Sequence, residues 1–222
     1  MPAGSLFAGS SGFSYPSWRG GFYPEGAKPS DFLSLYAEQL PSVELNATAY
    51  RIPAEEQLER WAAQTPSGFR FAVTMTRSAT FFGRVRGVDE FCRRARALGD
   101  RLGPIRIKVQ QARDDGFLRL LLDSLDPALP VGLDFRHDSW ETPGVQERLD
   151  ERGVARVDDD EGAAAFRYLR LREPPYAEED LAALAARIRP LLAAGKDVYC
   201  YFRHEDEPTA PAYALRLLEL AQ

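Results

Sequence analysis

The feature that most constrains the fold is a regular alternation of strand and helix patterns along the whole chain. Short apolar runs typical of buried strands occur at 6–9, 43–48, 69–74, 105–110, 131–136, 154–158, 168–172 and 198–202. Helical patterns follow most of them, at 32–40, 53–62, 89–98, 117–125, 140–149, 178–195 and 210–220. Eight strands and seven helices predict one α/β domain over residues 1–222, a TIM-like (β/α)₈ barrel. An open doubly wound sheet is the alternative, but the first strand is followed by Gly9-Ser10-Ser11-Gly12 and not by a dinucleotide-binding fingerprint.

The composition is that of an ordinary globular domain. Of the 222 residues, 45% are hydrophobic and 27% are charged, and the formal net charge is −5. This charge gives no general attraction to nucleic acid or to an anionic membrane, although a local cationic patch would. Since no signal peptide or membrane span is recognisable, we expect a cytoplasmic protein. Cys92 and Cys200 lie on apolar faces, so we expect two separate, reduced thiols.

The segment 43–50, VELNATAY, indicates how the strands divide their side chains. Apolar Val43 and Leu45 alternate with polar Glu44 and Asn46. In a barrel the outer face packs under helices, whereas the inner face opens at the carboxyl ends of the strands, which we call the mouth. The same alternation in the other strands predicts a convergent inward set: Glu44, Asn46, Lys108, Gln110, Asp134, Arg136, Arg170, Arg172, Tyr201 and Arg203.

The inward set is rich in cations although the chain is acidic. Guanidinium groups match phosphate or carboxylate, so the set predicts a site for an anionic small molecule or nucleic acid. An internal lattice of ion pairs that neutralises Glu44 and Asp134 explains the same residues, and both interpretations remain open. The candidate ligand-binding residues are Asn46, Tyr50, Arg77, Lys108, Gln110, Arg136, Arg170, Tyr201 and Arg203.

Three residues are candidates for catalysis. Glu44 and Asp134 would form an acid–base pair, and His137 follows a strand end, as does His204. A mixed metal site is another role for this region, with ligands from His137, His204, Glu205, Asp206 and Asp158. No pattern identifies a cofactor, a particular metal or an oligomeric state.

Two loops are rich in aromatic residues. Residues 10–30 form a long loop after the first strand, which we expect to fold over the mouth. Its aromatic residues suit a satellite core better than a stacking platform. Residues 76–86 combine Arg77, Arg84 and Arg86 with Phe81 and Phe82, a mixture that suits a nucleotide base or simple anchoring of the loop.

Several motifs resemble one known family, the domain of unknown function 72 or YecE-like proteins. They are GSSGFSYPSWRGGFYPEG at 9–26, VELNATAYRIP at 43–53, WAAQTPSGFRFAV at 61–73, LDFRHDSW at 133–140 and GKDVYCYF at 195–202. The resemblance spans nearly the whole chain and implies a (β/α)₈-type barrel, without an established reaction. Residues that match the family pattern are Glu44, Asn46, Thr48, Tyr50, Arg77, Gln110, Arg136, His137 and Trp140.

The departures from that pattern fall at the predicted mouth. The family usually has lysine at Thr74 and histidine at Phe81. Other changes lie at 110–113, which includes Gln111 and Ala112, at Arg172-Glu173, and at Arg203-His204-Glu205. Either the ligand has changed, or the chemistry is lost and the barrel kept. The hypotheses are an enzyme that hydrolyses a phosphate-bearing molecule, a non-catalytic ligand-binding protein, and a scaffold that binds a partner protein.

Overall fold

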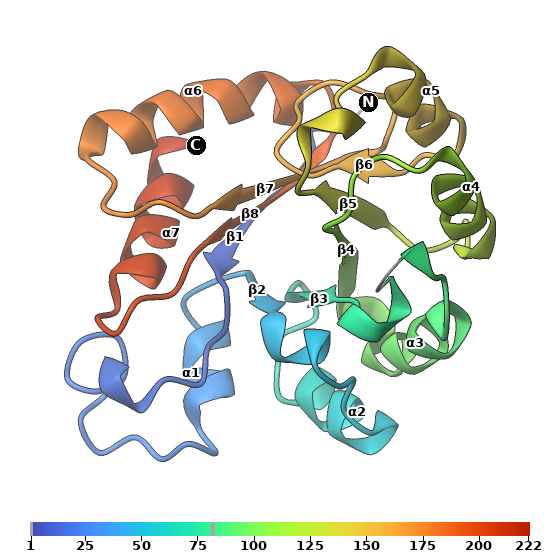
Figure 1. The fold of residues 1–222 in the computed structure, drawn as a ribbon. Coiled ribbons are helices and arrows are strands. Elements are labelled where there is room, and N and C mark those ends of the chain that lie inside the picture. The colour runs from blue at the N-terminus through green and yellow to red at the C-terminus, as the bar shows by residue number, and fades with distance from the viewer. Residues whose placement is uncertain (1, 81–82) are drawn as a thin grey trace.

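The computed structural model describes residues 2–80 and 83–222 and has the predicted alternation (Figure 1). Its strands are β1 (Leu6–Ser10), β2 (Ser42–Leu45), β3 (Arg70–Thr74), β4 (Leu102–Val109), β5 (Val131–Phe135), β6 (Ala155–Arg156), β7 (Phe166–Leu171) and β8 (Asp197–Phe202). Its α-helices are α1 (Phe32–Ala37), α2 (Glu55–Ala63), α3 (Val88–Ala95), α4 (Asp115–Ser124), α5 (Pro143–Glu151), α6 (Glu178–Ala193) and α7 (Thr209–Leu220). The helices surround the strands, which occupy the centre of the view.

The strands are parallel and follow one another in a TIM-barrel-like order. One sheet runs β2-β3-β4-β5-β6 and the other β1-β8-β7. An isolated parallel bridge between Val157 and Tyr168 joins the sheets where β6 meets β7. In the described part of the chain β1 and β2 share no backbone ladder, although they lie in contact. The predicted α/β class and the TIM-barrel-like strand order are therefore confirmed. Among the described residues, no ladder joins β1 to β2, and a single bridge joins the two sheets near β6 and β7.

The hydroxyl of Tyr36, from α1, connects β1 to β2. It accepts a hydrogen bond from the Ser10 amide at 2.8 Å and donates one to the Ser42 carbonyl at 3.1 Å. A Cβ atom on Gly9 would lie 1.9 Å from the Ser42 carbonyl oxygen, so a side chain at this position would push the strands apart. The fully buried Tyr36 thus supplies the polar contacts that a ladder would otherwise make.

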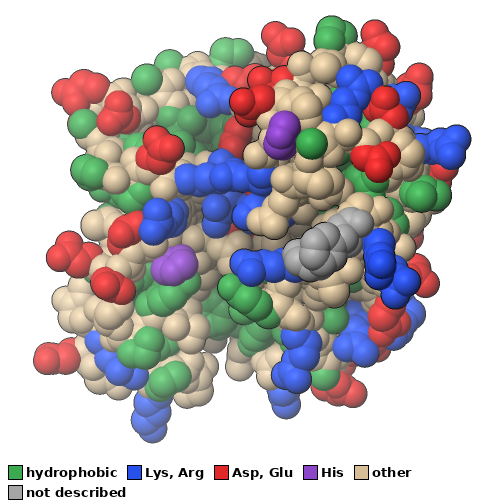
Figure 2. Space-filling view, in the orientation of Figure 1, with side chains coloured by type: hydrophobic (Ala, Val, Ile, Leu, Met, Phe, Trp, Pro, Cys, Tyr) green, Lys and Arg blue, Asp and Glu red, His purple; other side chains and the backbone are tan. Residues whose placement is uncertain are grey.

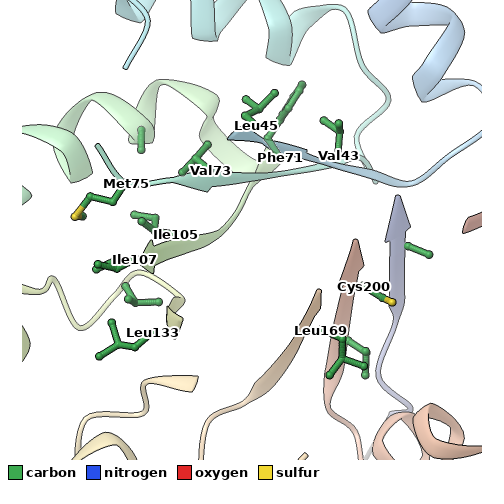
Figure 3. Packing of buried hydrophobic residues seen from close by; sticks show 14 of the residues in the cluster. Val43, Leu45, Phe71, Val73, Met75, Ile105, Ile107, Leu133, Leu169 and Cys200 are labelled. Atoms are coloured by element: carbon green, nitrogen blue, oxygen red, sulfur yellow. The ribbon is translucent and has the colours of Figure 1, made fainter. Parts of the chain in front are cut away.

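The outward faces of the strands pack under the helices, as the alternation predicted. Val43, Phe71, Ile105 and Leu133 are completely buried and belong to one continuous apolar cluster (Figure 3). Burying these faces against helices stabilises the fold by removing apolar area from water. The two cysteines are free and buried, as expected. Where the outward side chains are fixed in this way, the residues between them must face the interior.

The predicted strand at 43–48 is too long. Strand β2 ends at Leu45, and Asn46–Ala49 form a 3₁₀ turn. The buried Thr48 hydroxyl explains the change, because it lies 2.6 Å from the Leu45 carbonyl and 2.7 Å from the Thr74 carbonyl and accepts a bond from the Thr74 amide at 3.0 Å. Asn46 therefore lies in this turn, and its side-chain direction is not set by the alternation of a strand.

Two helices, α2 and α5, begin later than predicted. Helix α2 starts at Glu55 and not at Pro53. Helix α5 starts at Pro143 because Trp140 ends a 3₁₀ turn, where its indole Nε1 donates to the Gln111 carbonyl at 2.7 Å.

The long loop after β1 packs its aromatic residues into the core. Trp18 and Tyr23 are at most 1% exposed, and the Tyr23 ring stacks on Phe32 with centroids 4.4 Å apart. The indole of Trp18 donates to the Glu205 carbonyl at 3.1 Å, which ties the loop to the segment after β8. In the other aromatic loop, Phe81 and Phe82 lie outside the described residues.

Candidate functional site

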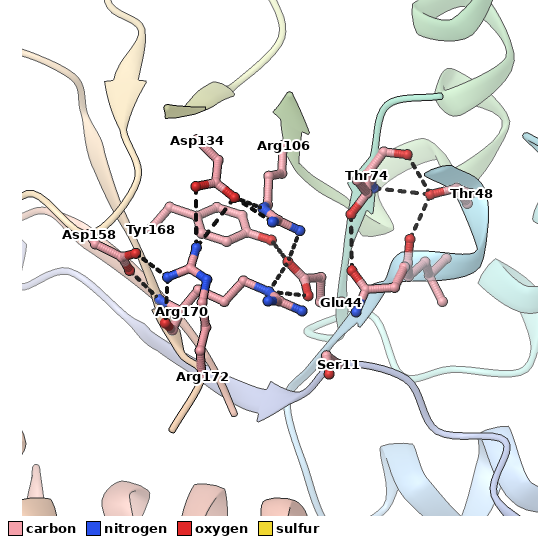
Figure 4. A network of polar contacts seen from close by, with 12 residues as sticks. Ser11, Glu44, Thr48, Thr74, Arg106, Asp134, Asp158, Tyr168, Arg170 and Arg172 are labelled. Carbon is pink, nitrogen blue, oxygen red and sulfur yellow. Dashed lines mark hydrogen bonds and ion pairs between the residues drawn. The ribbon is translucent and has the colours of Figure 1, made fainter. Parts of the chain in front are cut away.

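A buried network of charged side chains lies at the centre of the mouth (Figure 4). Arg106 from β4 stands between Glu44 from β2 and Asp134 from β5. Its Nη1 lies 3.3 Å from Glu44 Oε1 and its Nε 3.0 Å from Asp134 Oδ2, and a second Asp134 contact is made by Nη2. The three side chains are no more than 5% exposed. One guanidinium therefore neutralises part of both carboxylates.

Each carboxylate has further donors of its own. Arg170 Nε lies 2.9 Å from Glu44 Oε2, and the Tyr168 hydroxyl donates to Glu44 Oε1 at 2.7 Å. Arg172 Nη2 lies 3.3 Å from both Asp134 oxygens, and Arg136 Nη1 lies 3.5 Å from Oδ1. Arg172 also pairs with Asp158. The ion-pair lattice that the sequence offered as one interpretation is thus formed in the structure.

The network keeps both carboxylates ionised. Burial alone would raise the pKa of Glu44, but Arg106, Arg170 and the Tyr168 hydrogen bond outweigh it and hold that pKa below the ordinary value. Burial and the opposing attraction of Arg106 and Arg172 act in the same way on Asp134, whose pKa is also lowered. Burial, followed by the charge of Glu44, raises the pKa of Tyr168, which stays protonated as a donor. The two candidate catalytic carboxylates are therefore weak bases with occupied oxygens.

Beside this network lies a hollow over the ends of β2, β3 and β4, which we call the cationic pocket. Its volume is about 480 Å³. The residues that line it are Asn46, Ala49, Tyr50, Thr74, Met75, Arg77, Thr80, Arg106, Lys108, Gln110, Gln111 and Arg170. Four of them are cations, and none of these described lining residues is acidic. Figure 2 shows Lys and Arg side chains gathered across the centre of this face, whereas most acidic side chains lie toward its periphery.

Two cations of the cationic pocket differ from the network arginines. Lys108 is half-buried, and its ammonium group makes no ion pair or hydrogen bond within residues 2–80 and 83–222. Its pKa is lowered, first by burial and then by the charge of Arg136, with Asp134 acting in the opposite direction. Arg77 lies over the ring of Tyr50, 4.6 Å from the centroid, and donates to its hydroxyl at 3.3 Å, again with no carboxylate partner among the described residues.

A second hollow, of about 910 Å³, lies over the ends of β5 and β6. We call it the acidic hollow, because its lining includes the carboxylates Asp134, Asp138, Glu141, Asp158, Asp159, Asp160 and Glu161. His137 and Arg136 also line it. His137 is exposed, and its Nδ1 accepts a hydrogen bond from the Ser139 amide at 3.2 Å, so the ring caps the 3₁₀ turn that begins at Asp138.

The other predicted ligand-binding residues fall in several places. Asn46 and Gln110 line the cationic pocket, where Asn46 Oδ1 accepts from the Thr74 hydroxyl at 3.3 Å. Tyr201 is completely buried, with its hydroxyl 2.5 Å from Ser42 Oγ, and reaches neither hollow. Arg203 is exposed, lines neither hollow and has Glu205 3.6 Å away.

His204 is held by the loop after β1. The Ser11 hydroxyl lies 3.1 Å from His204 Nδ1 and accepts from the His204 amide at 3.0 Å, while the imidazole stacks on Tyr15. Burial and Arg203 lower the pKa of His204. In the part of the chain that the structure describes, no three metal-ligating side chains come together, so the mixed histidine–acid site is not assembled.

Sequence reasoning left two central residues out of the convergent set. Arg106 lies on the same strand face as Lys108, and Tyr168 lies on the same face as Arg170. The period of two therefore places the side chains of Arg106 and Tyr168 in the interior as well. Each stands two residues before the strand's predicted mouth residue and therefore lies one layer deeper. The alternation pattern could have identified both residues, but the convergent set included only residues near the carboxyl ends of these strands.

The parallel strands, the surrounding helices and the polar mouth define a TIM-barrel-like α/β protein. Within this class the chain belongs to the family described as Protein of unknown function DUF72, whose model matches residues 7–222. In the described residues no helix is both long and apolar enough to cross a membrane.

Relatives support the same assignment. The chain is 31% identical over 137 residues to the UPF0759 protein YecE of Escherichia coli K12, covering 56% of this chain and 50% of that protein. The match thus spans only about half the length of this curated relative. A DUF72 family protein from Thermotoga maritima has a TM-score of 0.81 at 24% identity, covering 97% of this chain and 98% of the other. A DUF72 family protein from Enterococcus faecalis has a TM-score of 0.75 at 15% identity over 99% and 98% of the two chains. These structures support the fold.

The positions at which the sequence is expected to depart from the family pattern do not gather in one place. Thr74 and Gln111 line the cationic pocket, and Arg172 belongs to the buried network. Ala112 and Glu173 line neither hollow, and Phe81 is outside the described residues.

Proposed function

We propose that the cationic pocket binds a small molecule that carries a phosphate group. The observation that supports this most strongly is the pair Lys108 and Arg77, two cations without a carboxylate partner in the described residues, in a hollow whose described lining has no acid. An ammonium group that loses water without gaining a counter-ion is destabilised, and a bound anion removes that cost. A phosphate offers oxygens enough for both groups.

The size and polarity of the cationic pocket favour a small molecule over a nucleic acid strand. A volume of about 480 Å³ lies in the range of small-ligand sites. Asn46, Thr74 and Thr80 place amide and hydroxyl groups along the same walls, where they suit the hydroxyls of a sugar.

The same geometry favours binding without hydrolysis by the predicted carboxylates. A general base needs a free oxygen and a pKa near the working pH. Glu44 and Asp134 have lowered pKa values and accept hydrogen bonds from several arginines. We therefore assign them the role of holding Arg106 and Arg170 in the pocket wall.

Calorimetric titration with ribose 5-phosphate, with ribose as the uncharged control, tests the proposal. We expect ribose 5-phosphate to bind and ribose not to bind. Lys108→Gln and Arg77→Gln should each weaken binding by roughly tenfold to a hundredfold, the usual worth of a charged hydrogen bond. Lys28→Gln is the matched control, because Lys28 is exposed and is not among the residues that line the pocket.

Equal binding by the parent and by Lys108→Gln would show that any bound phosphate lies elsewhere. Short single-stranded DNA should compete weakly. If it displaced the sugar phosphate at lower concentration, the ligand would be nucleic acid and the small-molecule proposal would be wrong.

A further inference from the structure

The ring of Tyr50 is the least protected aromatic group in the described chain. It is 74% exposed, and the only other large hydrophobic residue that is comparably exposed there is Leu120. Tyr50 directly follows the 3₁₀ turn Asn46–Ala49, and its amide donates to the Ala47 carbonyl at 3.1 Å. The backbone beneath the ring is thus fixed, although the ring itself is open to water.

Arg77 holds the Tyr50 ring at the rim of the cationic pocket. Its guanidinium covers the ring at 4.6 Å from the centroid and also donates to the phenol oxygen. Such a contact stabilises the ring orientation and leaves most of the aromatic surface available to a ligand. Since Arg77 also lines the cationic pocket, the ring and the phosphate-binding groups belong to one site.

The walls of this site differ in chemistry. Tyr50, Ala49 and Met75 supply apolar surface, whereas Lys108 and Arg77 supply positive charge. A ligand that satisfies both has a flat apolar part joined to an anionic part, with polar groups between them for Asn46 and Thr74. Aromatic side chains stack on nucleobases for this reason, and arginine strengthens such platforms.

We propose that the ligand of the cationic pocket is a mononucleotide, with its base stacked on Tyr50 and its phosphate held by Lys108 and Arg77. This inference rests on the proposed function, and it adds the aromatic base to the ligand. The enclosed volume accommodates a single nucleotide, so the neighbouring nucleotides of a strand are not needed for binding.

The test compares two ligands in three proteins. AMP and ribose 5-phosphate share the sugar and the phosphate and differ only in the base. In the parent protein, AMP should bind about tenfold more tightly than ribose 5-phosphate, as expected for one stacked base. Tyr50→Ala should remove this advantage, so that AMP and ribose 5-phosphate bind this variant with affinities within about threefold of each other. Tyr50→Phe, which keeps the ring and loses the hydroxyl, should retain the advantage.

The outcomes separate this inference from the proposed function. If ribose 5-phosphate binds through Lys108 and AMP binds no more tightly, the site takes a sugar phosphate and the nucleotide inference is wrong. An AMP advantage that survives in Tyr50→Ala, with circular dichroism equal to that of the parent, also overturns it. If neither ligand binds, both proposals fail. Because Tyr50 is exposed, we expect its variants to fold normally.

Discussion

The cationic pocket and the acidic hollow share one buried network but use their arginines differently. Arg106 lines the first and its partner Asp134 lines the second. Around the acidic hollow the cations have counter-ions: Arg136 has Asp134, and Arg156 lies 3.8 Å from Asp159. In the cationic pocket, Lys108 and Arg77 have no such partner among the described residues.

This difference shows that local pairing decides where anion binding is favourable, and not the number of arginines. An arginine that already pairs with an aspartate must lose that contact to bind a ligand, whereas an unpaired lysine gains one. The net charge of −5 does not distinguish the two regions, because the carboxylates gather on one side of the mouth.

The largest expected effect follows from breaking the network that both regions share. Arg106→Leu leaves Glu44 and Asp134 buried with fewer cations. Removing one partner of a buried ion pair costs about 3–5 kcal/mol, and the remaining arginines place this variant near the lower end. Urea denaturation should therefore show a loss of about 3 kcal/mol in the free energy of unfolding.

A surface pair supplies the control for this prediction. Arg216 pairs with Glu178, and both side chains are more than 40% exposed. Arg216→Leu should change the midpoint of unfolding far less than Arg106→Leu. Equal changes would mean that the buried network is no more important for stability than an exposed ion pair.

The second prediction concerns acid stability. The pKa values of Glu44 and Asp134 are lower in the folded protein than in the unfolded chain, so the unfolded state binds more protons as the pH falls. Their contribution is fully present above the unfolded pKa of about 4 and is lost as the pH drops through the folded pKa values. Each extra proton adds a slope of about 1.4 kcal/mol per pH unit to the free energy of unfolding.

Denaturation measured from pH 7 to pH 3 checks this slope, with Glu44→Gln as the comparison. The variant starts from lower stability and should depend less steeply on pH, because one of the two carboxylates is gone. An unchanged slope would indicate that other acids, on the acidic hollow or the surface, control the acid transition.

The sequence predicted the fold because its strongest signals are local. Apolar alternation identified the strands, and the inward direction of Glu44, Lys108 and Asp134 followed from the period of two. Asn46 shows the limit of that rule. The hydroxyl of Thr48 bonds to a carbonyl of β3, and this tertiary contact ends β2 before the polar pattern ends.

The pairing of the inward side chains could not be predicted in the same way. Which carboxylate pairs with Arg106 depends on the register between strands and on the depth of each residue in the interior. Neither property can be read from the sequence of a single strand. Tyr201 illustrates the depth problem, since it points inward as predicted but lies buried against Ser42 and not at the mouth. Lys108 could be placed inward, but that it has no counter-ion among the described residues became known only from the positions of its neighbours.

The last prediction has the smallest expected effect and tests whether the cationic pocket and the acidic hollow are separate sites. Arg136→Gln should leave the affinity for ribose 5-phosphate within about twofold, because Arg136 lines the acidic hollow and faces Asp134. Arg203→Gln should do the same, since Arg203 lines neither hollow and has Glu205 beside it. Arg136 lowers the pKa of Lys108, so the Arg136→Gln change slightly favours the charged ammonium of Lys108. This gain offsets part of the long-range attraction between Arg136 and the phosphate that the variant loses.

Calorimetry on both variants and on Lys108→Gln measures the difference in their affinities. A tenfold loss in Arg136→Gln would show that the ligand reaches across the buried network, and the two regions would then form one site.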